Sequence, residues 1–302
     1  MNIQPKNMKI KKNGDNRELH IVWPDKHETV YSMEWLEKNS YSGVSQSEWS
    51  KKRILWDAGS IQDSMPTVVD YKSYMQHDES LKQVLENLVV YGFAVVGDDV
   101  PLSVEETQKV AERISYVRVT LYGKMWSFSS NLQMLDTAYT SEGLRAHVDN
   151  TYFNDPAGFK AAENLKTKNP EYYDILSRVG LKHQFIDRDI HVAATGPILY
   201  HDPVSNELSQ VRFNTYDRTT ISHLDNHNLM AFYHALSSYA KEVASSENEL
   251  WFKLRPGNVL LVDNWRVMHG RSSFTGYRHI CGCYMPRDDL IGRFRTLLGM
   301  KI

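Results

Sequence analysis

The sequence predicts an α+β fold built around a β-sandwich or barrel. Helical patterns come first, many strand patterns follow in the later part of the chain, and long connections join those strands. A folded sheet with flanking helices satisfies this order. The 302 residues suffice for one large domain with a smaller unit. We expect a small β-rich domain at 1–60 and a larger domain at 61–302.

The first sixty residues have the pattern of strand, turn, strand and short helix. Residues 19–23 are apolar and extended, 24–27 form a turn, and 29–31 return as a second strand. Ser32 then has a side chain suited to capping a helix. A polar stretch separates this small unit from the rest of the chain.

The larger domain is expected to begin with helices and to end with strands. Ser103, followed three residues later by Glu106, has the capping-box pattern of a helix start. The expected elements are a helix at 81–91, a buried strand at 92–96, a helix from 103 to 117, an extended segment at 144–153, a helix at 169–179, strands from 184 onward, a helix at 227–244, a buried strand at 259–262 and a last strand at 277–285.

The composition excludes several classes of protein. Apolar residues at 41% and charged residues at 24% are ordinary for a soluble globular protein. A formal net charge of −2 provides no general attraction to nucleic acid or to a membrane surface. No run of eighteen apolar residues is present, which excludes a membrane-spanning helix. Cys281 and Cys283 occupy alternate positions, a poor geometry for a disulfide, which favours a reducing compartment.

Three side chains have the pattern of a metal site. His147 and Asp149 are two residues apart in an extended pattern, so both point to the same face. His269 follows a buried strand, where the end of the strand would face the mouth of a barrel. Two imidazoles and one carboxylate form the facial set that holds Fe(II) and leaves coordination positions open. The spacing alone also allows a second interpretation, in which the histidines are ordinary hydrogen-bonded structural residues.

Arg278 is the candidate partner for an anionic co-substrate. It follows His269 by nine residues and shares strand parity with Tyr284, so both face inward if either does. A buried guanidinium needs an anion, and a carboxylate is a good match for it. A second His-x-Asp pattern, His223 and Asp225, precedes a helix, so we interpret it as a loop histidine and a helix cap.

Longer segments of the chain carry the pattern of a known family. They are VWPDKH (22–27), RILW (53–56), AERIS (111–115), DTAYT (136–140), HVDNTYF (147–153), DNWRVMHGR (263–271), FTGYR (274–278) and CGCY (281–284). Together, from about His20 to the C-terminus, they resemble the γ-butyrobetaine hydroxylase and trimethyllysine dioxygenase family of Fe(II)/2-oxoglutarate oxygenases. Residues 150–153 and 274–277 are nearer to the trimethyllysine member.

The resemblance implies a fold, a chemistry and a set of ligands. The core would be a double-stranded β-helix (jelly-roll) with flanking helices. His147, Asp149 and His269 would bind Fe(II), and Arg278 would pair with the far carboxylate of 2-oxoglutarate. The reaction would be C3-hydroxylation of N6,N6,N6-trimethyllysine in carnitine biosynthesis, with succinate and CO2 as co-products and ascorbate as reductant. Hydroxylation of γ-butyrobetaine is the alternative within the family.

The resemblance also implies an aromatic cage for a quaternary ammonium substrate. The matching positions are Tyr122, Trp126, Tyr139 and Tyr284. A quaternary ammonium has no N–H donor, so ring faces are its natural partners. Tyr122 and Trp126 would share a face if their stretch were helical. Asn214 and Asp217 match the region that contacts the polar end of the substrate. Ordinary core packing is the alternative function for these rings.

The sequence departs from the family at one internal point. The family continues after its Pro-x-Gly segment with a strand, a Thr-Gly-Gly turn and another strand, whereas Phe159 here runs almost directly into residues that match the next helix. A core hairpin of roughly twenty residues is therefore expected to be missing after Phe159. Its loss should expose sheet edges and open the pocket. We expect a shortened form that is poorly stable or inactive.

A second departure concerns the N-terminal unit. The family's small domain holds zinc with three cysteines and a histidine. His27 matches the histidine, but no cysteine precedes Cys281, so we expect a truncated domain without zinc. The start of the chain is basic but lacks the other features of a secretory signal or transit peptide. The resemblance implies the mitochondrial matrix; without it the cytoplasm is expected.

One function outside the enzyme class stays open. The chain could be a non-catalytic subunit that pairs with a full-length copy through exposed sheet edges. For the enzyme, the expected partner is a small quaternary ammonium molecule, with no nucleic acid or membrane, and a homodimer is left open. A visible absorption band with Fe(II) and 2-oxoglutarate would distinguish the two functions.

Overall fold

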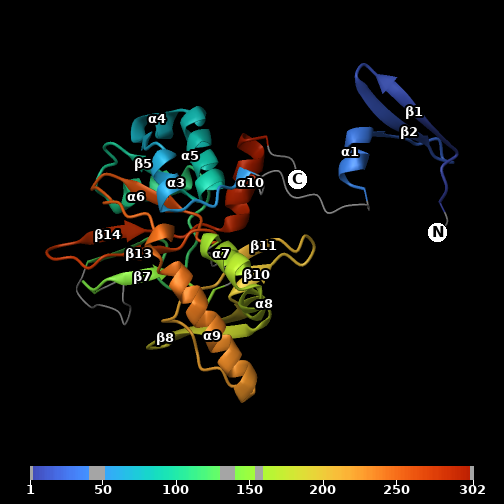
Figure 1. The fold of residues 1–302 in the computed structure, drawn as a ribbon. Helices are drawn as coiled ribbons and strands as arrows, with labels where there is room; N and C mark the ends of the chain where they lie inside the picture. Colours follow the sequence, from blue (N-terminus) through green and yellow to red (C-terminus); the bar gives the residue numbers. More distant parts are fainter. Residues whose placement is uncertain (1–2, 41–51, 130–139, 154–158, 300–302) are drawn as a thin grey trace. The chain divides into compact units, whose positions relative to one another are not determined.

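The computed structural model describes residues 3–40, 52–129, 140–153 and 159–299 (Figure 1). The chain divides into two compact units, Met1–Ser47 and Glu48–Ile302. This division lies earlier than the expected boundary at residue 60, which falls inside helix α3 (Ala58–Asp63). None of the helices in the described ranges combines the length and the apolarity that crossing a membrane requires.

The first unit is an antiparallel sheet followed by a short helix. Its elements are β1 (Asn7–Asn13), β2 (Asn16–Val22), β3 (Glu28–Ser32) and α1 (Met33–Lys38), with the strands in the order β1-β2-β3. Ser32 caps α1 by accepting a hydrogen bond from the Trp35 N–H at 3.0 Å, as predicted. β1 is not among the expected strands, although Met8 and Ile10 alternate with lysines as in a strand, and the whole strand is exposed.

The first core of the second unit is a small sheet covered by helices. Its elements are β4 (Val69–Asp70), α4 (Tyr71–Gln76), α5 (Asp78–Tyr91), β5 (Phe93–Gly97), α6 (Val104–Glu112), β12 (Val259–Val262) and α10 (Arg287–Leu297). The strand order is β12-β5-β4. Leu81, Leu85 and Leu88 recur at helical spacing and form the buried face of α5. Gly92 ends α5 at φ 84°, and a Cβ there would collide with the Val267 side chain.

The second core of this unit joins three helices to two strand pairs. Its elements are α7 (Lys160–Lys168), α8 (Pro170–Arg178), β8 (Gly180–Asp187), β9 (Ile190–Pro197), β10 (Leu199–His201), β11 (Leu208–Val211) and α9 (Asn226–Val243). Phe232 and Tyr239 of α9 are fully buried in the same cluster as Leu165 and Leu176. Asp225 caps α9, as predicted, by accepting a hydrogen bond from a backbone N–H.

Two further strand pairs join early and late parts of the chain. β6 (Trp126–Ser129) pairs with β14 (His279–Gly282), and β7 (Leu144–His147) pairs with β13 (His269–Arg271), both antiparallel. In Figure 1 the green and orange-red strands lie side by side at these places. Over the described ranges the strands form six sheets of two or three strands each. The mixture of helices and strands confirms the α+β prediction.

Three predicted elements are wrong in extent. The strand expected at 277–285 is β14 and covers only His279–Gly282, so Arg278 and Tyr284 lie outside it. The helix expected from 103 to 117 ends at Glu112, because Ile114, Tyr116 and Val117 are weak helix formers. The segment expected to be extended over 144–153 is a strand only to His147. Asn150 has φ 59°, the left-handed conformation that asparagine tolerates, and the chain turns there.

Candidate active site

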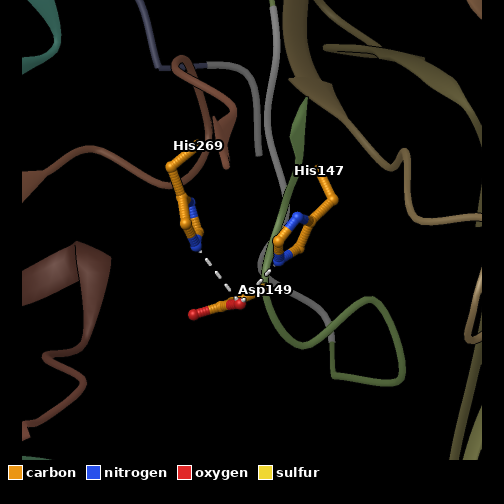
Figure 2. A group of neighbouring side chains, drawn as sticks. All are labelled: His147, Asp149 and His269. Atoms are coloured by element: carbon orange, nitrogen blue, oxygen red, sulfur yellow. Dashed lines mark ion pairs between the residues drawn. The ribbon is translucent and has the colours of Figure 1, made fainter. Parts of the chain in front are cut away.

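The three predicted metal ligands converge at the β7–β13 strand pair. His147 and His269 are direct partners in the antiparallel register, and their ring centroids are 4.8 Å apart. The Asp149 Oδ1 lies 3.5 Å from the His147 Nε2 and 3.4 Å from the His269 Nε2 (Figure 2). All three ligand atoms lie within 4.8 Å of one another. The pairing of two distant segments therefore builds the facial donor set that the spacing predicts.

The donor atoms suit a divalent cation such as Fe(II). The His147 Nδ1 lies 2.7 Å from the Arg145 carbonyl oxygen, which can only accept, so Nδ1 carries a proton. This arrangement leaves Nε2 as the nitrogen that faces Asp149, as in a histidine that binds metal. Two imidazole nitrogens and one carboxylate oxygen are ligands that iron accepts. The residues present therefore fit the metal that the sequence predicts.

The charges of the three groups are coupled. Burial lowers the pKa of His147, but the hydrogen bond and charge of Asp149 outweigh burial, so the pKa is raised overall. Burial would raise the pKa of Asp149, but His269 and His147 hold it well below its usual value. The carboxylate thus stays ionised and attracts a cation, which can be a proton on an imidazole or a metal ion.

The predicted cage residues that the structure describes gather around Tyr284. The Tyr284 ring centroid is 6.5 Å from that of Tyr122 and 6.3 Å from that of Trp126. Tyr139 lies outside the described residues. Trp126 begins β6 and Tyr122 lies in a turn, so the helical stretch considered for them is wrong; β6–β14 pairing brings Trp126 close to Tyr284 instead.

Tyr284 also contacts a metal ligand. Its hydroxyl donates a hydrogen bond to the Asp149 Oδ2 at 3.1 Å, the oxygen other than the one that faces the histidines. Burial, and then the charge of Asp149, raise the pKa of Tyr284 well above its usual value, so the hydroxyl stays protonated and can donate. One side chain thus belongs to the ring cluster and to the ligand shell.

Arg278 is half-buried and stacks on an aromatic ring. Its guanidinium carbon lies 5.6 Å from the Phe274 ring centroid, and that of Arg271 lies 5.3 Å from the same centroid. Burial, and then the charge of Arg271, lower the pKa of Arg278. Two guanidinium groups near one ring create a region of positive potential. An anion that bound there would be stabilised by both charges.

Asn214 and Asp217 are fixed to the segment that follows Asp149. The Asn214 amide donates a hydrogen bond to the Asp217 Oδ2 at 2.9 Å. The Thr151 hydroxyl donates to the same oxygen at 2.7 Å. The Asp217 carboxylate is therefore held by Thr151, which lies two residues along the chain from Asp149.

All nine described site residues line one cleft of about 2080 Å³. This volume is well above the roughly 300–1,000 Å³ typical of small-molecule pockets. Sequence reasoning misses Tyr152 in this cleft. Its hydroxyl lies 2.6 Å from that of Tyr122, and its ring packs against Phe185 at 5.2 Å between centroids. Tyr152 stands within the family-like segment 147–153, and its place in that segment is the signal that could have found it.

The chain matches one family of oxygenases over most of its length. The model of the taurine catabolism dioxygenase TauD, TfdA family matches residues 60–159 and 157–284, so the chain belongs to this dioxygenase family. Membership is consistent with the predicted jelly-roll core.

Within the family, similar curated proteins are trimethyllysine dioxygenases. The mitochondrial trimethyllysine dioxygenase of Rattus norvegicus is 41% identical over 98% of this chain and 75% of its own length. That of Homo sapiens is 41% identical over 99% of this chain and 75% of its own. The gamma-butyrobetaine dioxygenase of Homo sapiens is 26% identical over 94% of this chain and 81% of its own length.

Among solved structures, PvcB of Pseudomonas aeruginosa matches with a TM-score of 0.49 and 14% sequence identity. The match covers 71% of this chain and 82% of PvcB. This similarity is too low to support an inference about fold or function.

Proposed function

We propose that this chain is an Fe(II)- and 2-oxoglutarate-dependent dioxygenase that hydroxylates C3 of N6,N6,N6-trimethyllysine. The observation that carries the proposal is the convergence of two imidazole nitrogens and one carboxylate at the β7–β13 pair, in a cleft lined with aromatic rings. The relatives support the choice of substrate, because identity is 41% to a trimethyllysine dioxygenase and 26% to a gamma-butyrobetaine dioxygenase.

The proposed roles follow from the chemistry of each side chain. His147, Asp149 and His269 would hold iron, which when bound would use O2 to couple the oxidative decarboxylation of 2-oxoglutarate to substrate hydroxylation, one oxygen atom going to succinate and the other to the product. Arg278 pairs with the far carboxylate of 2-oxoglutarate, since a guanidinium matches a carboxylate in shape and charge. Ascorbate is the proposed reductant.

The substrate is held at both ends. The rings of Tyr122, Trp126 and Tyr284, together with Tyr139, accept the trimethylammonium group through their faces. Asn214 and Asp217 contact the other end. That end of trimethyllysine carries an α-ammonium group, which the Asp217 carboxylate attracts, whereas γ-butyrobetaine has only a carboxylate there. The fixed charge of Asp217 therefore favours trimethyllysine.

We also propose that a core hairpin is missing between Phe159 and Ala161, which lowers stability and turnover. Two observations support this. The family model matches in two pieces that meet at 157–159. The alignment with the Gallus gallus relative extends over 326 positions and covers 100% of the 302-residue chain, so about 24 positions face gaps in this chain (326 less 302). The cleft volume agrees with an open site.

A mitochondrial location and a place in carnitine biosynthesis are part of the same proposal. Their support is that the mammalian and avian relatives are named as mitochondrial trimethyllysine dioxygenases.

Product formation by the purified chain tests the proposed function. The chain is incubated with Fe(II), 2-oxoglutarate, ascorbate and either trimethyllysine or γ-butyrobetaine, and succinate and hydroxylated product are measured by mass spectrometry. We expect product from trimethyllysine, at a lower rate than a complete relative gives, and none from the Asp149→Ala control. Product from γ-butyrobetaine alone would contradict the substrate assignment.

A binding measurement separates the metal site from turnover. Under anaerobic conditions Fe(II) and 2-oxoglutarate should give a visible absorption band with the chain, and Asp149→Ala should abolish it. Absence of the band in the unmodified chain would contradict the proposed iron site. That outcome would favour the non-catalytic subunit instead.

A further inference from the structure

The side chain of Asn264 holds the backbone of the metal ligand Asp149. The Asn264 Oδ1 accepts a hydrogen bond from the Asp149 N–H at 3.2 Å, and its Nδ2 donates to the Asp149 carbonyl oxygen at 3.0 Å. A primary amide offers one acceptor and one donor, so it pairs with this residue as a neighbouring strand would. Two bonds fix the orientation of the Asp149 backbone as well as its position.

Strand pairing does not extend to Asp149. β7 ends at His147, whose partner is His269 at the start of β13, and the register shifts between His269 and Arg271. Asp149 lies two residues beyond the end of β7. The Asn264 side chain therefore hydrogen-bonds to the Asp149 backbone at the point where the hydrogen bonds between the two strands end.

The loop that carries Asn264 is itself anchored to the first core. The Arg266 guanidinium donates hydrogen bonds to the carbonyl oxygens of Leu88, Val89 and Val90 at the end of α5. The Asp263 N–H donates to the Gly92 carbonyl oxygen at 2.8 Å. Asn264 thus lies between two anchored residues, so its amide holds the Asp149 backbone at a fixed position relative to the first core.

We propose that Asn264 is a positioning residue for the metal site: its amide fixes the Asp149 backbone and so aims the carboxylate at the point where the two histidine Nε2 atoms converge. This inference rests on the proposed metal site. In this proposal the residue acts through Asp149, whose backbone it binds. Residues that orient a ligand typically change metal affinity by about 10–100-fold when they are replaced.

The test compares metal affinity in three variants of the full chain. Asn264→Ala removes both hydrogen bonds, and Asn264→Asp keeps the acceptor for the Asp149 N–H but loses the donor. Asn248→Ala is the matched control, because Asn248 also makes two side-chain hydrogen bonds, to Asn164 and to the Glu242 carbonyl, and neither involves the metal site. Binding of Mn²⁺, an air-stable ion that accepts the same ligands, is followed by the electron paramagnetic resonance signal of the free ion.

The dissociation constant for Mn²⁺ should rise about 10–100-fold in Asn264→Ala and by a smaller factor in Asn264→Asp. Asn248→Ala should melt at a lower temperature but keep the affinity of the unmodified chain. A purely structural role for Asn264 predicts the same behaviour as the control, namely a lower melting temperature with unchanged affinity.

Two results would overturn the inference while leaving the proposed function standing. One is unchanged Mn²⁺ affinity in a folded Asn264→Ala or Asn264→Asp chain. The other is failure of both variants to fold, since a positioning residue is not required for folding. Failure of the unmodified chain to bind Mn²⁺ would instead overturn the proposed metal site, and this inference with it.

Discussion

At the scale of single residues, Tyr284 connects the proposed ammonium cage to the proposed metal site. Its ring lies in the cluster with Tyr122 and Trp126, and its hydroxyl donates to the Asp149 Oδ2. A hydrogen bond from a hydroxyl to a carboxylate stabilises the ionised form and restricts rotation of the carboxylate. The ring and the hydroxyl therefore perform different tasks that two substitutions can separate.

Tyr284→Phe keeps the ring and removes the hydroxyl. A hydrogen bond to a charged group contributes about 1.5–3 kcal/mol, so we expect weaker metal binding by a factor of roughly ten or more with little change in KM for trimethyllysine. Tyr284→Leu removes the ring as well and should raise that KM further. Metal titration and steady-state kinetics measure the two effects. Equal KM values in the Phe and Leu variants would contradict a cage function for the ring.

The sequence identifies residues that act through their own chemistry better than residues that act through others. His147, Asp149 and His269 could be selected because imidazole and carboxylate groups at such spacings indicate a metal site, and the structure brings them together. Asn264 and Tyr152 stand in segments that resemble the family, but no spacing marks the backbone that Asn264 binds or the ring cluster that Tyr152 joins. Their partners become neighbours only in the folded chain.

At the scale of elements, β8 carries a histidine that constrains the pH range of stability. His183 is only 1% exposed. Burial, and then the charges of Arg212 and Arg218, lower its pKa to about 3. The folded chain keeps this ring neutral, whereas in the unfolded chain it takes up a proton near pH 6.5. The contribution of His183 to the free energy of unfolding is therefore fully present above pH 6.5 and is lost as the pH falls toward 3.

His183→Gln should flatten the pH dependence of stability. The pKa difference corresponds to about 2 kcal/mol of unfolding free energy lost between pH 8 and pH 5, and glutamine cannot titrate. Urea unfolding at both pH values measures the difference. His191→Gln, on the exposed face of the partner strand β9, is the control and should keep the original slope. Parallel profiles for His183→Gln and the unmodified chain would refute this assignment.

Elements with a strong apolar periodicity could be predicted from the sequence. Elements whose course depends on the conformation of a few backbone residues could not. α5, α9, β5 and β12 lie close to their expected ranges, because each buries a continuous apolar face or run. The turn after β7 depends on the left-handed conformation of Asn150, and apolar spacing carries no information about that angle. β1 lacks a buried face altogether.

At the scale of the whole molecule, the cleft is the feature that the proposed missing hairpin would explain. Nine site residues line a volume of about 2080 Å³, far more than trimethyllysine and 2-oxoglutarate would fill. Solvent in an open site weakens every electrostatic interaction that holds the co-substrates. The chain can thus have the side chains that the reaction needs and still lack a cleft that excludes solvent.

Restoring the hairpin should increase stability and turnover together. A chimera receives, between Phe159 and Lys160, the corresponding segment of the Rattus norvegicus relative. We expect a higher melting temperature and at least about a ten-fold gain in succinate formation, because one wall of the cleft is closed and sheet edges are paired. An insert of the same length made of glycine and serine controls for chain length. Equal rates in the two chimeras would count against the missing hairpin as the cause.

The β7–β13 pair has a consequence for how the protein matures. Of the proposed ligands, His147 and Asp149 leave the ribosome well before His269. A half-built site with two ligands holds a metal weakly, so iron loading of the proposed site would wait until the segment that carries His269 has left the ribosome. Bound metal would then join the strand that carries His147 to the late strand that carries His269, and iron supply would act on folding as well as on catalysis.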